Sequence, residues 1–365
     1  MSTILILANN DIGLYKFRKE LLQELVKSNK VYISLPHGEY ISKLEQLGCI
    51  FLNTPISRRG MNPFVDFKLF LNYKRILKKI KPDLVLTYTI KPNIYGGLAC
   101  RLSKTTYLTT VTGLGSGMEN GGILKSVLVL FYKTALKRVQ CIFFQNETNR
   151  DFFEKEKISK AKYVSLPGSG VNLTEHNFEE YPSEENKIEF LFIGRIMKHK
   201  GIDELFEAIK TIKAKHPSVN FKIIGWCEED YLSKLKDLQS DGLLEYLGYQ
   251  DNVHDYIKDC HAVVLPSYHE GMSNVLLEAA ATGRPVLASN ISGCKETFDE
   301  VISGFGFEPR DTNGLIQTLE KFIELPSEEK KTMGIAGRKK IEEEFDRDVI
   351  VNSYLKEIEN AIVKI

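Results

Sequence analysis

The stretch from Leu265 to Glu278 has the residue types and the spacing that can bind a charged ligand. Its first residues are apolar and predict the end of a buried strand, Pro266 to Ser273 predicts a turn, and Asn274 predicts the start of a helix. Gly271 lets the backbone approach a ligand closely, and Ser273 or Asn274 can cap the helix. Because the N–H groups and the positive dipole at a helix start favour an anion, we expect a phosphate group here.

Two carboxylates flank this expected anion site. Glu270 lies in the turn, and Glu278 lies about one turn inside the helix. Carboxylates repel phosphate, but they accept hydrogen bonds from hydroxyl groups such as those of a ribose or a hexose. The combination indicates a sugar nucleotide as the ligand. A surface loop followed by an ordinary capped helix is the alternative interpretation of these residues taken alone.

A second strand-to-helix turn carries a basic cluster. Glu189 to Gly194 predicts a strand that ends in glycine, and a helix is expected from about Ile202. Between them, Arg195 offers a planar fork for two phosphate contacts, and Lys200 offers a compact point charge. Such cations in one strand-to-helix turn suit phosphate, and a solvated basic loop is the alternative.

Both turns resemble the donor-binding half of the retaining glycosyltransferases of family 4. The motifs that carry the resemblance are Gly194-Arg195, Lys200-Gly201, Pro266-Ser267-Tyr268, Glu270-Gly271 and Glu278, with seven residues between the two glutamates. The resemblance covers nearly the whole chain and is strongest from 187 to 344. It implies an α/β chain with the GT-B fold, in which two Rossmann-like, doubly wound domains face each other across a cleft. A nucleotide diphosphate sugar would be held mainly by the C-terminal domain.

The resemblance also implies roles for single residues. Arg195 and Lys200 would contact the diphosphate, Glu270 would contact the transferred sugar, and Glu278 would contact the ribose. We therefore treat Glu270, Arg195 and Lys200 as the catalytic candidates. The further donor-binding candidates are Gly13, Gly194, Gly225, Tyr249, Gly271, Ser273, Asn274 and Val275.

The N-terminal half supplies the candidates for the acceptor side. A polar loop from Asn9 to Tyr15 is expected before a helix near Phe17, and two more strand ends lead into Thr87–Asn93 and Thr110–Gly117. Relatives in family 4 often carry a histidine near the position of Thr112, and this chain departs from that pattern. The acceptor or cleft candidates are Asn10, Tyr15, Lys91, Thr112 and Gly113.

The glycines from Gly113 to Gly117 read Gly-x-Gly-x-Gly. They lack the third glycine of a dinucleotide fingerprint, and no acidic residue follows at a suitable strand end. A nicotinamide enzyme is therefore a poor interpretation. The loop otherwise resembles bacterial transferases that build capsule, O-antigen or lipid-linked oligosaccharides on a polyprenyl diphosphate carrier.

Alternating strand and helix signals predict two domains. The first is expected from 1 to 174 and the second from 187 to 346, with an acidic linker containing Pro182 between them. A closing helix from 347 to 365 is expected to pack back onto the first domain, as it does in this fold. A length of 365 residues suits two cores, and 43% hydrophobic with 27% charged residues is typical of a soluble globular protein.

Charge is divided unevenly along the chain. Residues 1–170 hold 26 Lys and Arg against 12 Asp and Glu, whereas residues 171–365 hold 23 against 36. A basic N-terminal half favours an anionic partner or an anionic membrane surface, and no nucleic-acid motif accompanies it. Two basic amphipathic helices, Phe64–Lys81 and Ile123–Val139, can lie on such a surface or can pack on the sheet with their lysines in water.

No cofactor or metal is expected. The six cysteines contain no C-x-x-C pair, so the sequence indicates neither a zinc site nor a disulfide framework, and a reducing cytoplasm fits. Asp346-Arg347-Asp348 has the acid-x-acid form of a metal site, but helix capping explains it better. No targeting segment or membrane span is apparent, so we expect a cytoplasmic protein that is peripheral on the inner face of the membrane.

The sequence thus predicts a retaining, metal-independent glycosyltransferase. It would move a hexose-type sugar from a nucleotide diphosphate donor, a UDP-sugar, to a polyprenyl-diphosphate-linked or surface glycan. The alternatives are a sugar-nucleotide epimerase of GT-B shape and a catalytically inactive sugar-nucleotide-binding subunit, and analysis of the reaction products separates the three. Nothing in the sequence indicates an oligomeric state, the sugar, or the linkage position.

Overall fold

The computed structural model describes residues 1–57, 62–113, 122–183 and 187–363. Contacts within the chain divide it into two compact units. Unit 1 contains Met1–Ser169 and Asp348–Ile365, and unit 2 contains Gly170–Arg347. Each unit is built around one parallel sheet, so the predicted α/β class with two doubly wound sheets is confirmed.

Unit 1 has a seven-stranded sheet in the order β3-β2-β1-β4-β5-β6-β7. Its strands are β1 (Thr3–Leu7), β2 (Lys30–Leu35), β3 (Ile50–Asn53), β4 (Leu84–Tyr88), β5 (Tyr107–Val111), β6 (Cys141–Phe144) and β7 (Lys162–Ser165). All neighbouring strands pair in parallel. The order changes direction between β1 and β4, and in doubly wound sheets ligands bind at the carboxyl ends of the strands near such a point.

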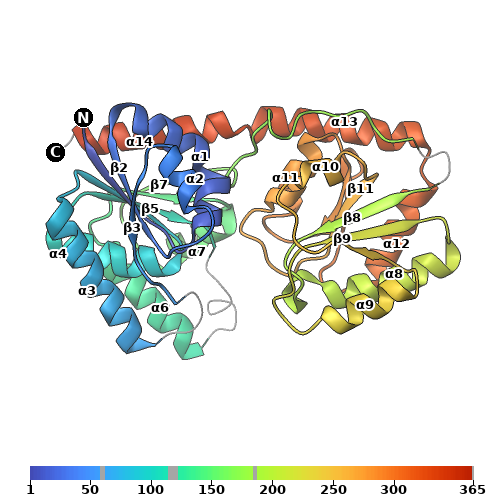
Figure 1. The fold of residues 1–365 in the computed structure, drawn as a ribbon, viewed down its shortest axis with the longest axis horizontal. Helices are drawn as coiled ribbons and strands as arrows, with labels where there is room; N and C mark the ends of the chain where they lie inside the picture. Colours follow the sequence, from blue (N-terminus) through green and yellow to red (C-terminus); the bar gives the residue numbers. More distant parts are fainter. Residues whose placement is uncertain (58–61, 114–121, 184–186, 364–365) are drawn as a thin grey trace. The chain divides into compact units, whose positions relative to one another are not determined.

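Helices cover both faces of this sheet (Figure 1). In β1, Ile4 and Ile6 pack in the core under one set of helices, whereas Leu5 and Leu7 pack in the core under the other. The first set is α1 (Asp11–Ser28), α2 (Ile41–Gln46) and α14 (Arg347–Val363). The second set is α3 (Pro63–Ile80), α4 (Gly97–Ser103) and α6 (Gly122–Ala135), with α7 (Glu147–Lys155) beside it.

Helix α14 belongs to unit 1 although it follows unit 2 in the sequence. The ring of Tyr354 lies 4.3 Å from that of Phe143, and its hydroxyl lies 3.0 Å from Thr110 Oγ1. The guanidinium of Arg18 in α1 lies 5.4 Å from the same tyrosine ring. These buried contacts attach α14 to the sheet of unit 1.

Unit 2 has a six-stranded parallel sheet in the order β10-β9-β8-β11-β12-β13. Its strands are β8 (Glu189–Ile193), β9 (Asn220–Ile224), β10 (Glu245–Tyr246), β11 (Ala262–Leu265), β12 (Val286–Ser289) and β13 (Gly304–Phe307). Figure 1 shows helices on both faces. They are α8 (Ile202–Lys215), α9 (Leu232–Ser240) and α12 (Thr312–Glu324) on one face, and α10 (His254–Ile257), α11 (Asn274–Ala281) and α13 (Ser327–Glu344) on the other.

The start of α1 differs from the prediction. The sequence predicts a polar loop from Asn9 to Tyr15, but α1 already begins at Asp11. The side chain of Asn10 caps the helix, because its Oδ1 accepts a hydrogen bond from the Gly13 N–H at 2.5 Å. Gly13 and Tyr15 therefore lie in the first turns of a helix and not in a loop.

The predicted linker also differs. Residues 175–183 lie in unit 2, where the fully buried guanidinium of Arg284 donates to the carbonyls of Glu179 at 3.0 Å and Glu180 at 2.7 Å. The hydroxyl of Tyr181 donates to the His261 carbonyl at 3.0 Å. The segment is thus attached to unit 2 by hydrogen bonds that its acidic composition does not reveal.

Among the described residues, no helix has both the length and the hydropathy that crossing a membrane requires.

Candidate active site

Three glycines line the carboxyl edge of the sheet in unit 2. Gly194, Gly225 and Gly248 follow β8, β9 and β10, and the Gly225 N–H donates to the Gly248 carbonyl at 2.8 Å. A Cβ on Gly225 would lie 1.7 Å from the Gly194 oxygen, and its φ is +146°. Because no larger residue fits, the backbones at the ends of β8 and β9 approach each other closely here.

Lys200 and Glu270 form an ion pair at the same edge. Lys200 lies in the short helical turn Lys198–Lys200 after β8, and Glu270 lies in the loop after β11. The relative exposures of the two side chains are only 16% and 13%. Two of the three catalytic candidates predicted from the sequence therefore lie in direct contact, although 70 residues separate them.

Backbone contacts hold these two loops together. The Tyr268 N–H donates to the His199 carbonyl at 2.9 Å. Gly201 has a φ of +68°, and a Cβ there would lie 2.0 Å from the Pro266 oxygen. The position of Lys200 relative to Glu270 is thus fixed by the backbone on both sides.

The carboxylate of Glu270 has a second partner. Ser267 Oγ donates to Glu270 Oε1 at 2.7 Å, and that oxygen also accepts from Lys200. Behind the pair lies Cys294, whose thiol pKa is raised well above its usual value by burial and by the charge of Glu270. Cys294 is therefore a neutral thiol, and the charged chemistry belongs to Lys200 and Glu270.

Helix α11 begins beside Glu270. Ser273 is its N-cap residue, with Oγ accepting from the Leu276 N–H at 3.4 Å. Asn274 Oδ1 is buried and has no hydrogen-bond partner among the described residues. Like every helix start, this one leaves N–H groups of its first turn without a helical acceptor, here near Asn274 and Val275. Glu278 is half-buried in the second turn.

Glu296 stabilises the turn before the short helix Lys295–Thr297. Its carboxylate accepts from the Gly293 N–H at 2.7 Å and from Ser292 Oγ at 3.2 Å. Gly293 in turn contacts the loop of Glu270, because a Cβ on Gly293 would lie 2.8 Å from the Glu270 carbonyl oxygen. Glu296 thus supports the site loop from behind.

Arg195 lies farther out than Lys200. It is 46% exposed and pairs with Glu228 at 2.6 Å, a partner that the sequence does not predict. Beyond β9 and β10, the rings of Trp226 and Tyr249 lie 5.3 Å apart and are both partly exposed. Contact of Tyr249 with the donor stays a prediction.

Unit 1 places Lys91 in a nearly buried ion pair. Its Nζ lies 2.7 Å from Oδ1 of Asp66, a residue of α3 that is almost completely buried. The hydroxyl of Tyr95 donates to the same carboxylate at 3.2 Å, and burial together with the charge of Asp66 raises the pKa of Tyr95 to about 12. Sequence reasoning missed Asp66 and Tyr95, although Asp66 is the only acid among the many cations of its helix.

Strained and open backbone marks the strand ends next to Lys91. Thr89, directly after β4, has a φ of +71°, which is rare for a β-branched residue. Thr112 and Gly113 follow β5, and no atom of the described residues lies within 4 Å of where a Gly113 Cβ would stand. The remaining glycines of that loop, up to Gly117, lie outside the described residues. Such strain is concentrated at functional sites, so this end of unit 1 is a second candidate site.

Comparisons with known proteins decide the family. The model described as "Glycosyl transferases group 1" matches residues 174–340, and the model described as "Glycosyl transferase 4-like" matches residues 3–146. The chain is a glycosyltransferase, with one domain of each kind.

Two curated relatives span nearly the whole glycosyltransferase, and a third spans about three quarters of it. A Campylobacter jejuni protein is 27% identical over 98% of both chains and is named N,N'-diacetylbacillosaminyl-diphospho-undecaprenol alpha-1,3-N-acetylgalactosaminyltransferase. The capsular polysaccharide biosynthesis glycosyltransferase CapM of Staphylococcus aureus is 26% identical over 97% of both chains. An Escherichia coli UDP-Gal:alpha-D-GlcNAc-diphosphoundecaprenol alpha-1,3-galactosyltransferase is 27% identical over 73% of this chain and 72% of its own.

Solved structures show the same fold. Anabaena HepE in complex with UDP-glucose has a TM-score of 0.81 at 17% identity, covering 99% of this chain and 100% of its own. WaaG, described as a glycosyltransferase of lipopolysaccharide biosynthesis, has a TM-score of 0.73 at 14% identity, covering 93% of this chain and 95% of its own. These similarities support the GT-B fold with its two Rossmann-like units.

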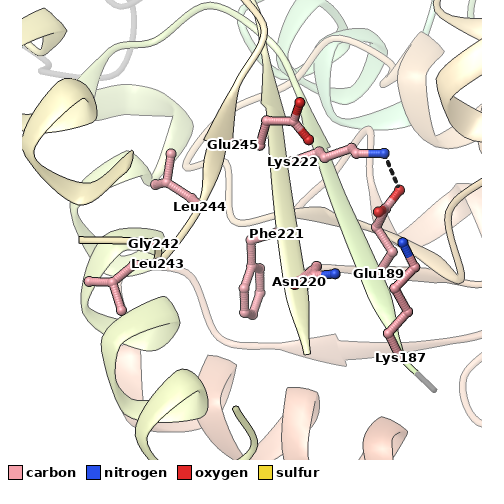
Figure 2. A pocket seen from close by; sticks show the side chains of 9 residues that line it. All are labelled: Lys187, Glu189, Asn220, Phe221, Lys222, Gly242, Leu243, Leu244 and Glu245. Carbon is pink, nitrogen blue, oxygen red and sulfur yellow. Dashed lines mark ion pairs between the residues drawn. The ribbon is translucent and has the colours of Figure 1, made fainter. Parts of the chain in front are cut away.

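The glycosyltransferase also has a pocket at the opposite edge of the sheet in unit 2. Figure 2 shows its lining, where Lys222 and Glu189 form an ion pair at 2.8 Å. The pocket has a volume of about 270 Å³ and lies at the amino ends of β8, β9 and β10. Ligands of doubly wound sheets bind at the carboxyl ends, so this pocket is separate from the candidate active site.

No group of three or more His, Cys, Asp or Glu side chains in the described part of the glycosyltransferase is placed to hold a metal ion.

Proposed function

We propose that this glycosyltransferase is a retaining enzyme that moves a hexose-type sugar from a UDP-sugar to a lipid-linked or surface polysaccharide acceptor. The observation that carries the proposal is the Lys200–Glu270 pair beside the capped start of α11. A cation and a helix start suit the diphosphate of a donor, and a carboxylate between them suits the hydroxyl groups of its sugar. No nicotinamide or nucleic-acid function explains this combination.

The reaction exchanges one C–O bond for another. The bond from the anomeric carbon to the diphosphate oxygen breaks, and the oxygen of an acceptor hydroxyl bonds to that carbon on the same face. The acceptor proton goes to the leaving diphosphate oxygen. Negative charge builds on the diphosphate in the transition state, where Lys200, Arg195 and the N–H groups near Asn274 stabilise it. Glu270 orients the transferred sugar, and Glu278 binds the ribose.

The names of two relatives support the acceptor part of the proposal. The C. jejuni and E. coli proteins are named for acceptors that carry diphospho-undecaprenol. An acceptor of that kind is anchored in a bilayer, so we propose that the enzyme works as a peripheral protein at the cytoplasmic face of a membrane. The free cysteines agree with a reducing compartment.

The charge of one face of unit 1 supports the membrane part. The segments Pro63–Lys81, Gly97–Lys104 and Gly122–Arg138, which contain α3, α4 and α6, hold 12 Lys and Arg. Their only carboxylate is Asp66, which is buried and paired with Lys91. A face with so many cations and no exposed carboxylate of its own suits anionic lipid.

Product analysis tests the proposal directly. The enzyme is incubated with single UDP-hexoses and UDP-N-acetylhexosamines and with a short prenyl-diphosphate sugar as acceptor. We expect mass spectrometry to find the acceptor heavier by one sugar, and NMR to show the anomeric configuration of the donor preserved. An inverted linkage would contradict the retaining mechanism. An epimerised donor would indicate an epimerase, and binding without transfer would indicate an inactive sugar-nucleotide-binding subunit.

We predict that transfer does not need a divalent metal. Lys200, Arg195 and the start of α11 already counter the charge of the diphosphate, which is the task of a metal in other transferases. Rates measured in EDTA are therefore expected to equal those in magnesium or manganese. Loss of activity in EDTA that manganese restores would show that the two cations are insufficient, and it would direct attention to Asp346 and Asp348.

We also predict peripheral, salt-sensitive binding to anionic vesicles. A variant with Lys74, Arg75, Lys78 and Lys79 changed to glutamine should bind vesicles rich in phosphatidylglycerol much more weakly, since each cation contributes on the order of 1 kcal/mol at the surface. Co-sedimentation at low and high salt measures this, because salt screens exposed charges. The matched control neutralises Lys210, Lys213, Lys215 and Lys236 in unit 2. If both variants lose vesicle binding equally, the face of unit 1 is not the membrane-binding surface.

A further inference from the structure

The first turn of α3 exposes three apolar side chains. Phe64 is 83% exposed, Phe67 is 57% exposed, and Val65 is 41% exposed. We call these three residues the α3 wedge. Exposing two phenylalanines one helical turn apart is costly in water, although Phe67 also lies 6.1 Å from the ring of Phe70. A cluster of exposed apolar side chains is often found where a partner covers it.

The α3 wedge stands on a rigid base. The side chain of Asn62 accepts hydrogen bonds from the N–H groups of Phe64 at 3.1 Å and Val65 at 3.3 Å, and Pro63 takes the first helical position. Within the same turn, Asp66 points inward to its ion pair with Lys91. Because breaking that buried pair would leave a charge without a partner, the turn cannot rotate to bury its phenylalanines.

The charge around the wedge indicates which partner covers it. Lys68, Lys74 and Arg75 follow on the same helix and are exposed. In a twofold dimer through this face, identical cationic surfaces would meet and repel each other. Lipid with anionic headgroups offers both an apolar layer for the rings and negative charge for the cations.

We propose that Phe64, Val65 and Phe67 insert into the acyl-headgroup boundary of an anionic bilayer. This insertion rests on the proposed function, which places the enzyme at a membrane. It adds an apolar contact with the acyl chains to the electrostatic attraction between the cations and the headgroups. Insertion predicts a part of the membrane affinity that high salt does not remove, because burial of apolar surface is not screened. The ion pair of Asp66 with Lys91 then joins the inserted turn to the strand end at Thr89.

A single tryptophan probe tests insertion at the wedge itself. The chain has one tryptophan, Trp226, so Trp226→Phe followed by Phe64→Trp places the only indole on the wedge. With vesicles of phosphatidylglycerol and phosphatidylcholine we expect a blue shift of its emission and quenching by brominated acyl chains. The matched control is Ile302→Trp in the same background, at a position in unit 2 that is 62% exposed, and it should show neither effect.

A second variant keeps the native tryptophan and measures affinity. Phe64→Ser with Phe67→Ser should lower partitioning into these vesicles at high salt by roughly tenfold or more. Its thermal midpoint and its transfer to a water-soluble acceptor should stay unchanged, which separates insertion from catalysis.

Three results would overturn the insertion. They are an unshifted indole at position 64 in protein that sediments with vesicles, no sedimentation at any salt concentration, and a dimer in ultracentrifugation that the serine variant converts to monomer. The third result would assign the wedge to a contact between two copies of the chain. None of them changes the sugar-transfer products that test the proposed reaction. The second result would also contradict the proposed membrane association, whereas the first and third would overturn insertion alone.

Discussion

Replacing Lys200 with methionine is expected to lower kcat/KM for sugar transfer roughly 30- to 1000-fold. This corresponds to a loss of about 2–4 kcal/mol of transition-state stabilisation. Lys200 is mostly buried, so its charge acts on a developing anion with little screening by water. Arg195→Ala should have a smaller effect, because Arg195 is 46% exposed and already has Glu228 as a partner. Initial rates over a range of donor concentrations measure both effects.

The matched control for Lys200 is Lys222→Met. Lys222 is also paired with a glutamate, Glu189 at 2.8 Å, but it lies at the opposite edge of the same sheet (Figure 2). We expect little change in transfer from this variant. If both lysine variants lose activity equally, the loss reflects the stability of unit 2, and the assignment of Lys200 to the diphosphate is wrong.

Glu270→Gln separates the sugar from the diphosphate. The variant removes the negative charge beside Lys200 and keeps the shape of the side chain, so UDP alone should bind at least as tightly as before. Transfer should still fall, since the amide is a weaker acceptor for sugar hydroxyl groups than the carboxylate. Calorimetry with UDP and rates with the UDP-sugar test the two halves, and weaker binding of UDP would contradict the proposed role.

Replacing Arg284 with methionine should destabilise unit 2 by about 3–4 kcal/mol. The side chain of Arg284 is 1% exposed and donates hydrogen bonds to five backbone carbonyls. In the methionine variant, these carbonyls would stay buried and would lose the hydrogen bonds from the guanidinium. The acceptors are those of Glu179, Glu180, Lys258, Thr282 and Gly283. Unfolding in urea followed by the fluorescence of Trp226 reports on unit 2 alone, because that residue is the only tryptophan.

Two further variants test the account of Arg284. Arg284→Lys keeps a cation but loses the planar fork, so it should recover only part of the stability. Lys339→Met removes a cation of α13 whose side chain is 75% exposed, and it should change the free energy of unfolding by less than about 0.5 kcal/mol. A loss below about 1 kcal/mol in Arg284→Met would mean that water replaces the lost donor.

The sheets could be predicted because buried parallel strands are short, continuous apolar runs. The strand predicted from Glu189 to Gly194 is β8, which ends one residue earlier at Ile193, and the buried strand predicted to end at Leu265 is β11. The encounter of Lys200 with Glu270 follows from the same reasoning. Each residue follows a strand, and the carboxyl ends of parallel strands meet at one edge.

Other features depend on contacts that no local pattern encodes. Asp66 meets Lys91 only because α3 packs with one particular face toward the turn after β4. Nothing in the local sequence distinguishes Arg284 from a surface arginine, because its burial depends on contacts with the distant segment near Glu179. The start of α1 can be predicted from the sequence, because Asn10 followed by Asp11 is a strong capping signal. The polar residues through Tyr15 also suit a loop, and this is why the predicted helix begins too late.

The return of α14 to unit 1 bears on how the protein is made. The core of unit 1 contains Ile350, Val351, Tyr354 and Ile358, which the ribosome adds only after all of unit 2. At ordinary rates of about 5–20 residues per second, the nascent N-terminal sheet waits about 10–40 seconds before α14 covers β4, β5 and β6 beside α1. Unit 2 has no such delay, so it can complete its core first during translation. The earlier part of the gene therefore encodes the unit that matures last, and its nascent form is the one most in need of a chaperone.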